Sequence, residues 1–173
     1  MSEGERSVEG TRRPDWDALY VRHAEELMRF AVKLLGDRER GADIAHEAFL
    51  RAMRSEGTLR EPGAARAWLF RITTNLVKNE LRRRRLLSFL PFTGSERGGE
   101  DAFDATAVQV HRALRSIPAD QAVALVLHHQ QGFSRREVAE LVGVSEEAVK
   151  SRLARGRRNF VAAYGRLERG LAG

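Results

Sequence analysis

Apolar residues recur three or four positions apart along most of the chain, and this spacing predicts helices. No segment shows the apolar–polar alternation of a strand, so we predict an all-α protein. Gly36 is expected to end the first helix and Asp37 to cap the second. Turn-forming residues fill segment 55–63, which is expected to be a loop. The predicted helices cover residues 15–35, 38–55, 64–85, 107–117, 119–131, 134–142 and 145–164.

The helical pattern is interrupted at residues 88–105, which contain three glycines, one proline and four acids against a single arginine. We predict a flexible linker here. The fold is then two small helical domains, 15–87 and 106–167, preceded by a flexible lead at 1–14. The segment 86–92 is too apolar for a free tether, and it either completes the core of the first domain or docks on a partner.

Segment 133–160 has the signature of a helix-turn-helix. Ser134 and Glu137 have the spacing of a capping box at the start of its first helix. Gly143 suits the tight turn because glycine takes a positive φ without a steric penalty. Ser145 is a good cap for the second helix. We therefore place a helix-turn-helix in the C-terminal domain.

The second helix of this motif is strongly basic. Lys150–Arg158 contains five cations and no anion. Such a helix fits the major groove of DNA and meets phosphates on both flanks. The alternative is a helical hairpin whose basic face is merely solvated.

The predicted helix at 64–85 carries a second nucleic-acid signal. One side is expected to be buried and comprises Trp68, Leu69, Ile72 and Leu76. A polar stripe at helical spacing comprises Arg71, Asn75, Lys78, Arg82 and Arg85. Cations on such a stripe can contact phosphates, and the Asn75 amide has the donor and acceptor needed to read a base edge. Taken alone, the stripe is equally typical of a solvated face.

Composition narrows the function further. The net charge of +6 suits a polyanionic partner, and the absence of cysteine excludes disulfides and thiolate chemistry. No apolar run approaches the ~20 residues of a membrane span, and the N-terminus lacks the apolar core of a signal peptide. We expect a cytoplasmic protein without membrane insertion.

Other candidate sites fail. His128 and His129 are adjacent, point roughly 100° apart on a helix and have no cysteine nearby, so we expect no metal site. Ser134, Ser145 and Ser151 have no paired base for nucleophilic catalysis, and residues 94–99 lack the lysine of a phosphate-binding loop. We therefore expect no cofactor and no enzymatic centre.

Two blocks of sequence resemble a known family. Residues 37–53 and 66–85 resemble region 2 of bacterial extracytoplasmic-function (group IV) sigma factors, and residues 116–160 resemble their region 4. The blocks have the order and spacing of that family, with no region 3 between them. The resemblance implies a transcription initiation factor whose partners are the clamp and flap regions of core RNA polymerase, promoter DNA and an anti-sigma protein.

The resemblance also implies roles for individual residues. Expected polymerase contacts are Asp43, His46, Glu47 and Phe49. Expected contacts to the minus-ten element are Arg71, Asn75, Lys78, Asn79 and Arg82, with Asn75 and the loop near 56–63 capturing an extruded base. Expected contacts to the minus-thirty-five element are Ser134, Arg135, Ser145, Lys150, Ser151, Arg152, Ala154, Arg155 and Arg158.

Some positions depart from the family pattern. Relatives commonly carry glutamine at the place of His46, and Gly-Thr-Val at the place of residues 147–149. Ala154 replaces a larger side chain in some relatives. The promoter sequence therefore does not transfer from relatives.

Two other classes of function compete with this interpretation. A stand-alone regulator that binds an operator would need a ligand pocket, a receiver domain or a dimerisation helix in the first domain, and none is recognisable. An adaptor without DNA contact conflicts with the cations of Lys150–Arg158.

Overall fold

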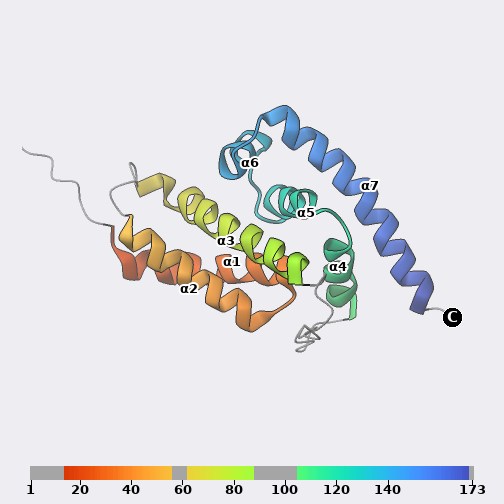
Figure 1. The fold of residues 1–173 in the computed structure, drawn as a ribbon. Helices are drawn as coiled ribbons and strands as arrows, with labels where there is room; N and C mark the ends of the chain where they lie inside the picture. The colour runs from red at the N-terminus through yellow and green to blue at the C-terminus, as the bar shows by residue number, and fades with distance from the viewer. Residues whose placement is uncertain (1–13, 56–61, 88–104, 172–173) are drawn as a thin grey trace, which may run out of the picture.

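The computed structural model describes residues 14–55, 62–87 and 105–171, and within these ranges the protein is all-α, as predicted (Figure 1). Three of the predicted segments lie wholly or mostly outside the described residues: the lead, the loop at 55–63, and the linker with the apolar residues 88–92. The α-helices are α1 (Trp16–Leu35), α2 (Arg38–Arg54), α3 (Ala65–Leu87), α4 (Ala105–Arg115), α5 (Ala119–Leu125), α6 (Arg135–Val142) and α7 (Glu146–Leu171). A short 3-10 turn, η2 (Pro62–Ala64), precedes α3, and a π-helical turn, η3 (Val126–Gln130), continues α5.

Local chemistry sets the ends of the first two helices. The Asp15 carboxylate accepts a hydrogen bond from the Ala18 amide at 3.0 Å and caps α1. Gly36 ends α1 in the left-handed conformation, with φ of 64°. Asp37 accepts a hydrogen bond from the Arg40 amide at 2.8 Å and caps α2. The predicted roles of Gly36 and Asp37 are confirmed.

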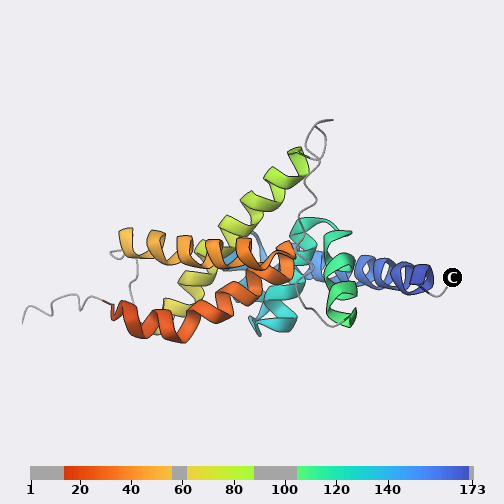
Figure 2. The same cartoon turned by 90° about the horizontal axis from the view of Figure 1, so that it is seen from below.

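The N-terminal helices form one packed unit. Helices α1 and α2 lie side by side, and α3 crosses them (Figures 1 and 2). The side chains at the centre of this unit are fully or almost fully buried: Leu27, Phe30, Leu34, Ile44, Ala48, Leu69 and Phe70.

The expected core of this unit needs two corrections. The apolar spacing over 38–55 predicts that Ile44, Ala48, Phe49 and Met53 are buried. Met53 is instead 47% exposed, because the buried face of α2 continues from Phe49 through Ala52. On α3 the fully buried side chains include Phe70, Thr73 and Thr74, which the sequence interpretation did not select. That interpretation assumed one buried side, whereas α3 packs on α1 and α2 and also on the C-terminal helices.

The C-terminal helices α4 to α7 form a second unit around Val123, Leu127, Val138, Val149 and Leu153. Helix α7 runs along its outer side and continues to Leu171, past the predicted end at 164 (Figure 1). Gly156 of α7 lies against α5, where a Cβ would come within 3.2 Å of Gln121 and Leu125. The lack of a side chain lets these two helices approach closely.

The two units pack against each other. Helix α3 contacts α5 and α6, and α1 contacts α4. At the α1–α4 side, a Cβ on Gly36 would overlap the ring of His111. Beside this contact is a cleft of about 360 Å³ whose lining includes Met28, Val32, Lys33, Arg38 and His111. No helix in the described ranges combines the length and apolarity needed to cross a membrane.

Candidate nucleic-acid interface

Hydrogen bonds fix the helix-turn-helix of α6 and α7. The Ser134 hydroxyl accepts from the Glu137 amide at 3.2 Å, and the Glu137 carboxylate accepts from the Ser134 amide at 2.8 Å. The second bond lowers the pKa of Glu137 and keeps it ionised. Gly143 takes φ of 71° in the turn, and the Ser145 hydroxyl accepts from the Ala148 amide at 3.2 Å. The predicted capping box, turn and second cap are confirmed.

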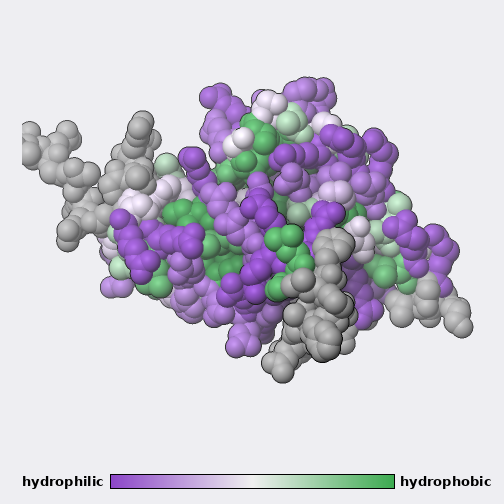
Figure 3. Space-filling view, viewed as in Figure 1, coloured by the Kyte–Doolittle hydropathy of each residue, from purple (hydrophilic) through white to green (hydrophobic). Residues whose placement is uncertain are grey.

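The first half of α7 presents cations to solvent. Lys150, Arg155 and Arg158 are exposed, while Ser151 and Ala154 are half-buried. Lys150 lies 3.4 Å from Glu147, and Arg155 donates to the Ser151 hydroxyl at 2.8 Å. Figure 3 shows the surface over α6 and α7 as mostly hydrophilic. Exposed pairs of this kind are weak, so DNA phosphates could displace them.

Arg135 and Arg152, which the family resemblance assigns to the same interface, have different surroundings. Arg135 of α6 reaches Glu146 of α7 at 3.6 Å, and both side chains are about half exposed. Arg152 is only 21% exposed and turns toward α5, where its guanidinium lies 3.2 Å from the Asp120 carboxylate.

The polar stripe of α3 is present on the surface. Arg71, Asn75, Asn79 and Arg82 are exposed. Lys78 is 26% exposed and lies 3.9 Å from Asp120, the same carboxylate that pairs with Arg152. One acid of α5 thus connects a cation from each of the two predicted DNA-binding sets.

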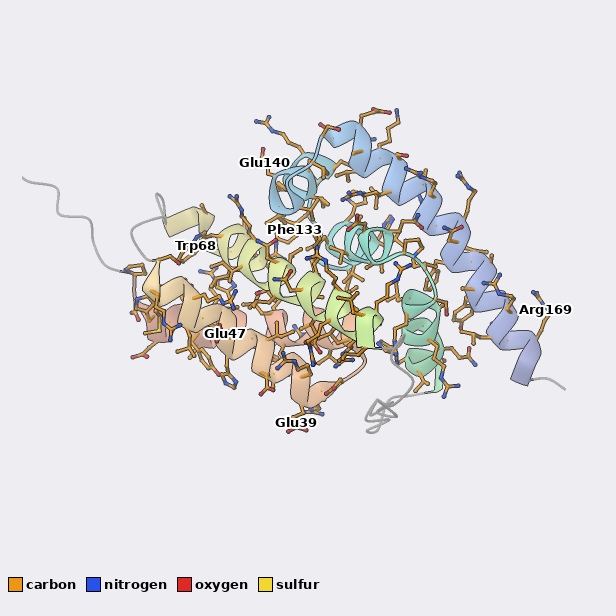
Figure 4. All side chains as sticks on the ribbon, in the orientation of Figure 1. Glu39, Glu47, Trp68, Phe133, Glu140 and Arg169 are labelled. Carbon is orange, nitrogen blue, oxygen red and sulfur yellow. The ribbon has the colours of Figure 1, made fainter. Side chains whose placement is uncertain are left out.

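The predicted polymerase contacts lie on α2 with mixed exposure. Asp43 is exposed and lies 3.5 Å from Arg40. Glu47, which Figure 4 labels on α2, accepts a hydrogen bond from Arg51 at 2.7 Å. His46 is exposed and hydrogen-bonds the Tyr20 hydroxyl at 2.7 Å.

Phe49 differs from its three neighbours in the predicted polymerase set. It is buried to 4% exposure, with its ring centroid 4.9 Å from that of Tyr20. Tyr20, which is 39% exposed, therefore covers Phe49 and also stacks on and hydrogen-bonds His46.

A buried carboxylate that sequence reasoning missed organises the end of α3. Glu80 is 4% exposed and accepts hydrogen bonds from Arg83, Arg84 and Arg40 at 2.8 to 3.1 Å. These bonds, first that from Arg83, lower the pKa of Glu80 to about 2. Arg83 and Arg84 follow Glu80 by three and four positions, which is a signal that the sequence contained.

The described part of the chain holds no group of three histidines, cysteines or acids that could bind a metal ion. His128 instead makes a structural contact, with its Nδ1 2.7 Å from the Phe133 carbonyl. The rings of His128 and His129 lie edge to face at 4.8 Å.

Comparisons with known proteins agree with this geometry. The Sigma-70 region 2 model matches residues 19–87, and the model of Sigma-70, region 4 matches residues 107–160. The ECF RNA polymerase sigma factor SigM of Mycobacterium tuberculosis is 33% identical over 164 residues, covering 90% of this chain and 80% of SigM. The ECF RNA polymerase sigma factor SigE of Mycolicibacterium smegmatis is also 33% identical, over 87% of this chain and 63% of SigE.

Solved structures show the same fold. The sigma factor RpoE of Bartonella quintana, in a crystal with the anti-sigma factor NepR, superposes with a TM-score of 0.68 at 22% identity. The superposition covers 86% of this chain and 96% of that one.

A region 2 unit followed by a region 4 helix-turn-helix defines a sigma-70-type transcription initiation factor. Within that class, the chain belongs to the ECF family of RNA polymerase sigma factors.

Proposed function

We propose that this sigma factor binds core RNA polymerase and directs it to promoters by reading two DNA elements with its two domains. The observation that carries this proposal is the pair of exposed polar surfaces, one on α3 and one on the first half of α7. Each surface belongs to a different domain, so the protein can contact two separate DNA segments.

The C-terminal domain places the start of α7 in the major groove of the minus-thirty-five element. Ser134 and Ser145 cap the starts of α6 and α7. Because the backbone amides at a helix start favour an anion, these two helix starts face DNA phosphates. Lys150 and Arg155 project from the exposed face, where they contact base edges or the neighbouring phosphates. Ser151 and Ala154 are half-buried and form the base of the surface that contacts DNA.

The N-terminal domain opens the minus-ten element with α3. Arg71 and Arg82 neutralise phosphates along the exposed stripe, and Asn75 hydrogen-bonds an extruded base. A flipped base shows its Watson–Crick edge, so this step combines melting with sequence choice.

The exposed face of α2 is proposed to bind the polymerase. Asp43, His46 and Glu47 offer polar groups to a partner, whereas the buried Phe49 supports this face from below. We expect no catalysis by this chain itself and a place of action in the cytoplasm. An anti-sigma protein is proposed as a further partner, because the sigma factor RpoE of Bartonella quintana, which has the same fold, was solved with the anti-sigma factor NepR bound.

Runoff transcription with purified core polymerase on a library of promoter fragments tests this function. We expect initiation at a subset of fragments only when the chain is added. Initiation that does not depend on the chain would reject the proposal. Binding of the chain alone to one operator, with no effect on polymerase, would favour a stand-alone regulator instead.

A further inference from the structure

The cleft beside the contact of α1 with α4 has the size and the position of a small-molecule site. Its volume of about 360 Å³ lies within the ~300–1,000 Å³ that ligand pockets occupy, and such pockets are common where two domains meet. Residues of α1, α4 and η3 line it, together with Arg38 at the start of α2. None of its described lining residues belongs to α3 or α7, so the cleft is separate from both proposed DNA-binding surfaces.

Part of the cleft is apolar. Met28 and Val32 come from successive turns of α1, and Ala107 comes from the first turn of α4. All three are half-buried, so each retains surface that a ligand can cover. We name these three residues the apolar wall. Because covering apolar surface is favourable, the wall suits a ligand with an apolar body.

The charged side chains of the cleft are mostly basic. Glu25 and Arg29 form an exposed pair at 3.0 Å and so offset each other. Lys33 and Arg38 also line the cleft, and within the described ranges neither side chain has an ion pair. Two unpaired cations beside an apolar wall favour a ligand that joins an anionic group to an apolar body.

His111 of α4 adds a hydrogen-bonding group to the same cleft. Its Nε2 atom is buried and has no hydrogen-bond partner among the described residues. Such an atom is costly to leave unsatisfied, and a ligand that hydrogen-bonds the ring would offset that cost. The ring is neutral near pH 7, because burial and then the charges of Arg115, Lys33 and Arg84 lower the pKa of His111 to about 4. A neutral imidazole still carries one N–H that can donate to an anion.

We propose that this cleft binds a small organic anion, a carboxylate or a phosphate ester on a compact apolar body. Lys33 and Arg38 bind the anionic group, and His111 donates a hydrogen bond to it. The apolar wall contacts the rest of the ligand. This function is additional to the proposed promoter and polymerase contacts and does not depend on them.

Titration of the full chain with four probes, followed in proton–nitrogen correlation spectra, tests the site. Benzoate and phenyl phosphate join a ring to either anionic group, benzyl alcohol keeps a ring without charge, and inorganic phosphate keeps the charge without a ring. At least one aromatic anion is expected to shift the amide signals of the lining residues saturably, with a Kd of about 1 mM or tighter for a ligand of this size. Benzyl alcohol and inorganic phosphate, which each lack one part of the ligand, are expected to bind about 10-fold more weakly.

Two outcomes of these titrations would overturn the proposal. One is the absence of saturable shifts at the cleft with either aromatic anion. The other is binding of inorganic phosphate as tightly as of phenyl phosphate, which would reduce the site to a patch of positive charge.

Variants test the charge and the shape of the cleft. Lys33→Gln and Arg38→Gln are each expected to weaken binding of the aromatic anion by roughly 3- to 10-fold. Ala107→Phe fills the cleft while it leaves every cation in place, so it is expected to abolish binding. Arg22→Gln is the matched control, because Arg22 is an exposed cation of α1 about three turns before Lys33 and does not line the cleft. Equal losses for Lys33→Gln and Arg22→Gln would attribute the effect to net charge and reject the site.

The His111 ring gives a readout that a purely structural role would not change. An anion in the cleft opposes the positive charges of Lys33, Arg38, Arg84 and Arg115, so the pKa of His111 should rise above about 4 when the aromatic anion is bound. Titration of the histidine ring signals measures this change, and His111→Gln identifies the signal that belongs to His111. An unchanged pKa would place the anion outside the cleft. Circular dichroism melts check that each variant is folded, and Ala107→Leu replaces Ala107→Phe if the latter unfolds.

Discussion

At the scale of single residues, Asn75 most clearly separates a promoter contact from an ordinary surface position. It is exposed on α3 and forms no part of the buried core. Asn75→Ala should change the free energy of unfolding by less than about 0.5 kcal/mol, because exposed helix positions tolerate such changes. It should nevertheless reduce permanganate reactivity of the melted strand and relax preference at one minus-ten base. Equal footprints for wild type and variant would assign Asn75 to the solvated surface.

Lys150 and Arg155 give the corresponding prediction for the minus-thirty-five element. Replacing either by alanine should weaken promoter binding by about 1–3 kcal/mol if it touches base edges, and by less if it touches phosphates only. Arg166→Ala is the matched control, since it removes one exposed cation from the same helix beyond the helix-turn-helix. Titration of promoter fragments at several salt concentrations measures both effects. Similar losses for Arg155→Ala and Arg166→Ala would contradict a specific groove contact.

At the scale of elements, Glu80 joins the end of α3 to the start of α2 through Arg40. Glu80→Gln should lower the free energy of unfolding by about 2 kcal/mol, because it removes the charge of a buried carboxylate that accepts hydrogen bonds from three guanidinium groups. Chemical denaturation measures this loss. Glu140→Gln, at an exposed acid, should cost less than about 0.5 kcal/mol.

The same carboxylate gives a pH dependence with a defined sign. The pKa of Glu80 falls from 4.5 to about 2 in the folded protein. The unfolded chain therefore takes up this proton first, so the contribution of Glu80 is present above pH 4.5 and is lost as the pH falls toward 2. The stability difference between wild type and Glu80→Gln should shrink over that interval. A constant difference would show that the ionised carboxylate is not what stabilises this junction.

Element ends could be predicted from sequence because their causes are local. Asp37, Gly36, Ser134 and Gly143 act on backbone groups within a few residues, and each has its predicted role. The exposure of the α3 stripe, Asn75 included, also followed from helical spacing.

The rest of the site depends on long-range packing. Arg66 contacts Glu26 and the Gln131 carbonyl, which are 40 and 65 positions away in sequence. Phe70 is buried between Phe30 of the N-terminal unit and Phe133 of the C-terminal unit. No periodicity within α3 contains that information, and the resemblance to a family gave roles to positions without giving the packing of one domain on the other.

At the scale of the whole molecule, His111 links domain packing to pH. Burial, followed by the charges of Arg115, Lys33 and Arg84, lowers the pKa of His111 to about 4. Its Nε2 is buried and has no hydrogen-bond partner among the described residues. The ring, which packs against Gly36, is therefore neutral near pH 7 in the folded protein.

The folded protein should lose stability as the pH falls from 6.5 toward 4, because the unfolded chain binds the His111 proton first. Melting temperatures measure this loss across that interval. His111→Gln, which cannot be protonated, should reduce the pH dependence of the melting temperature. If the variant keeps the wild-type pH profile, another group is responsible.

The position of Gly36 also constrains how the two domains can diverge over evolution. Its left-handed backbone admits glycine readily and asparagine less well, yet any Cβ there would overlap His111 from the other domain. The identity of residue 36 should therefore depend on residue 111. Among sequences that keep this packing, those with asparagine at position 36 should carry a small side chain at position 111. If residues 36 and 111 vary independently across many relatives, the packing of the two domains at this point does not constrain either residue.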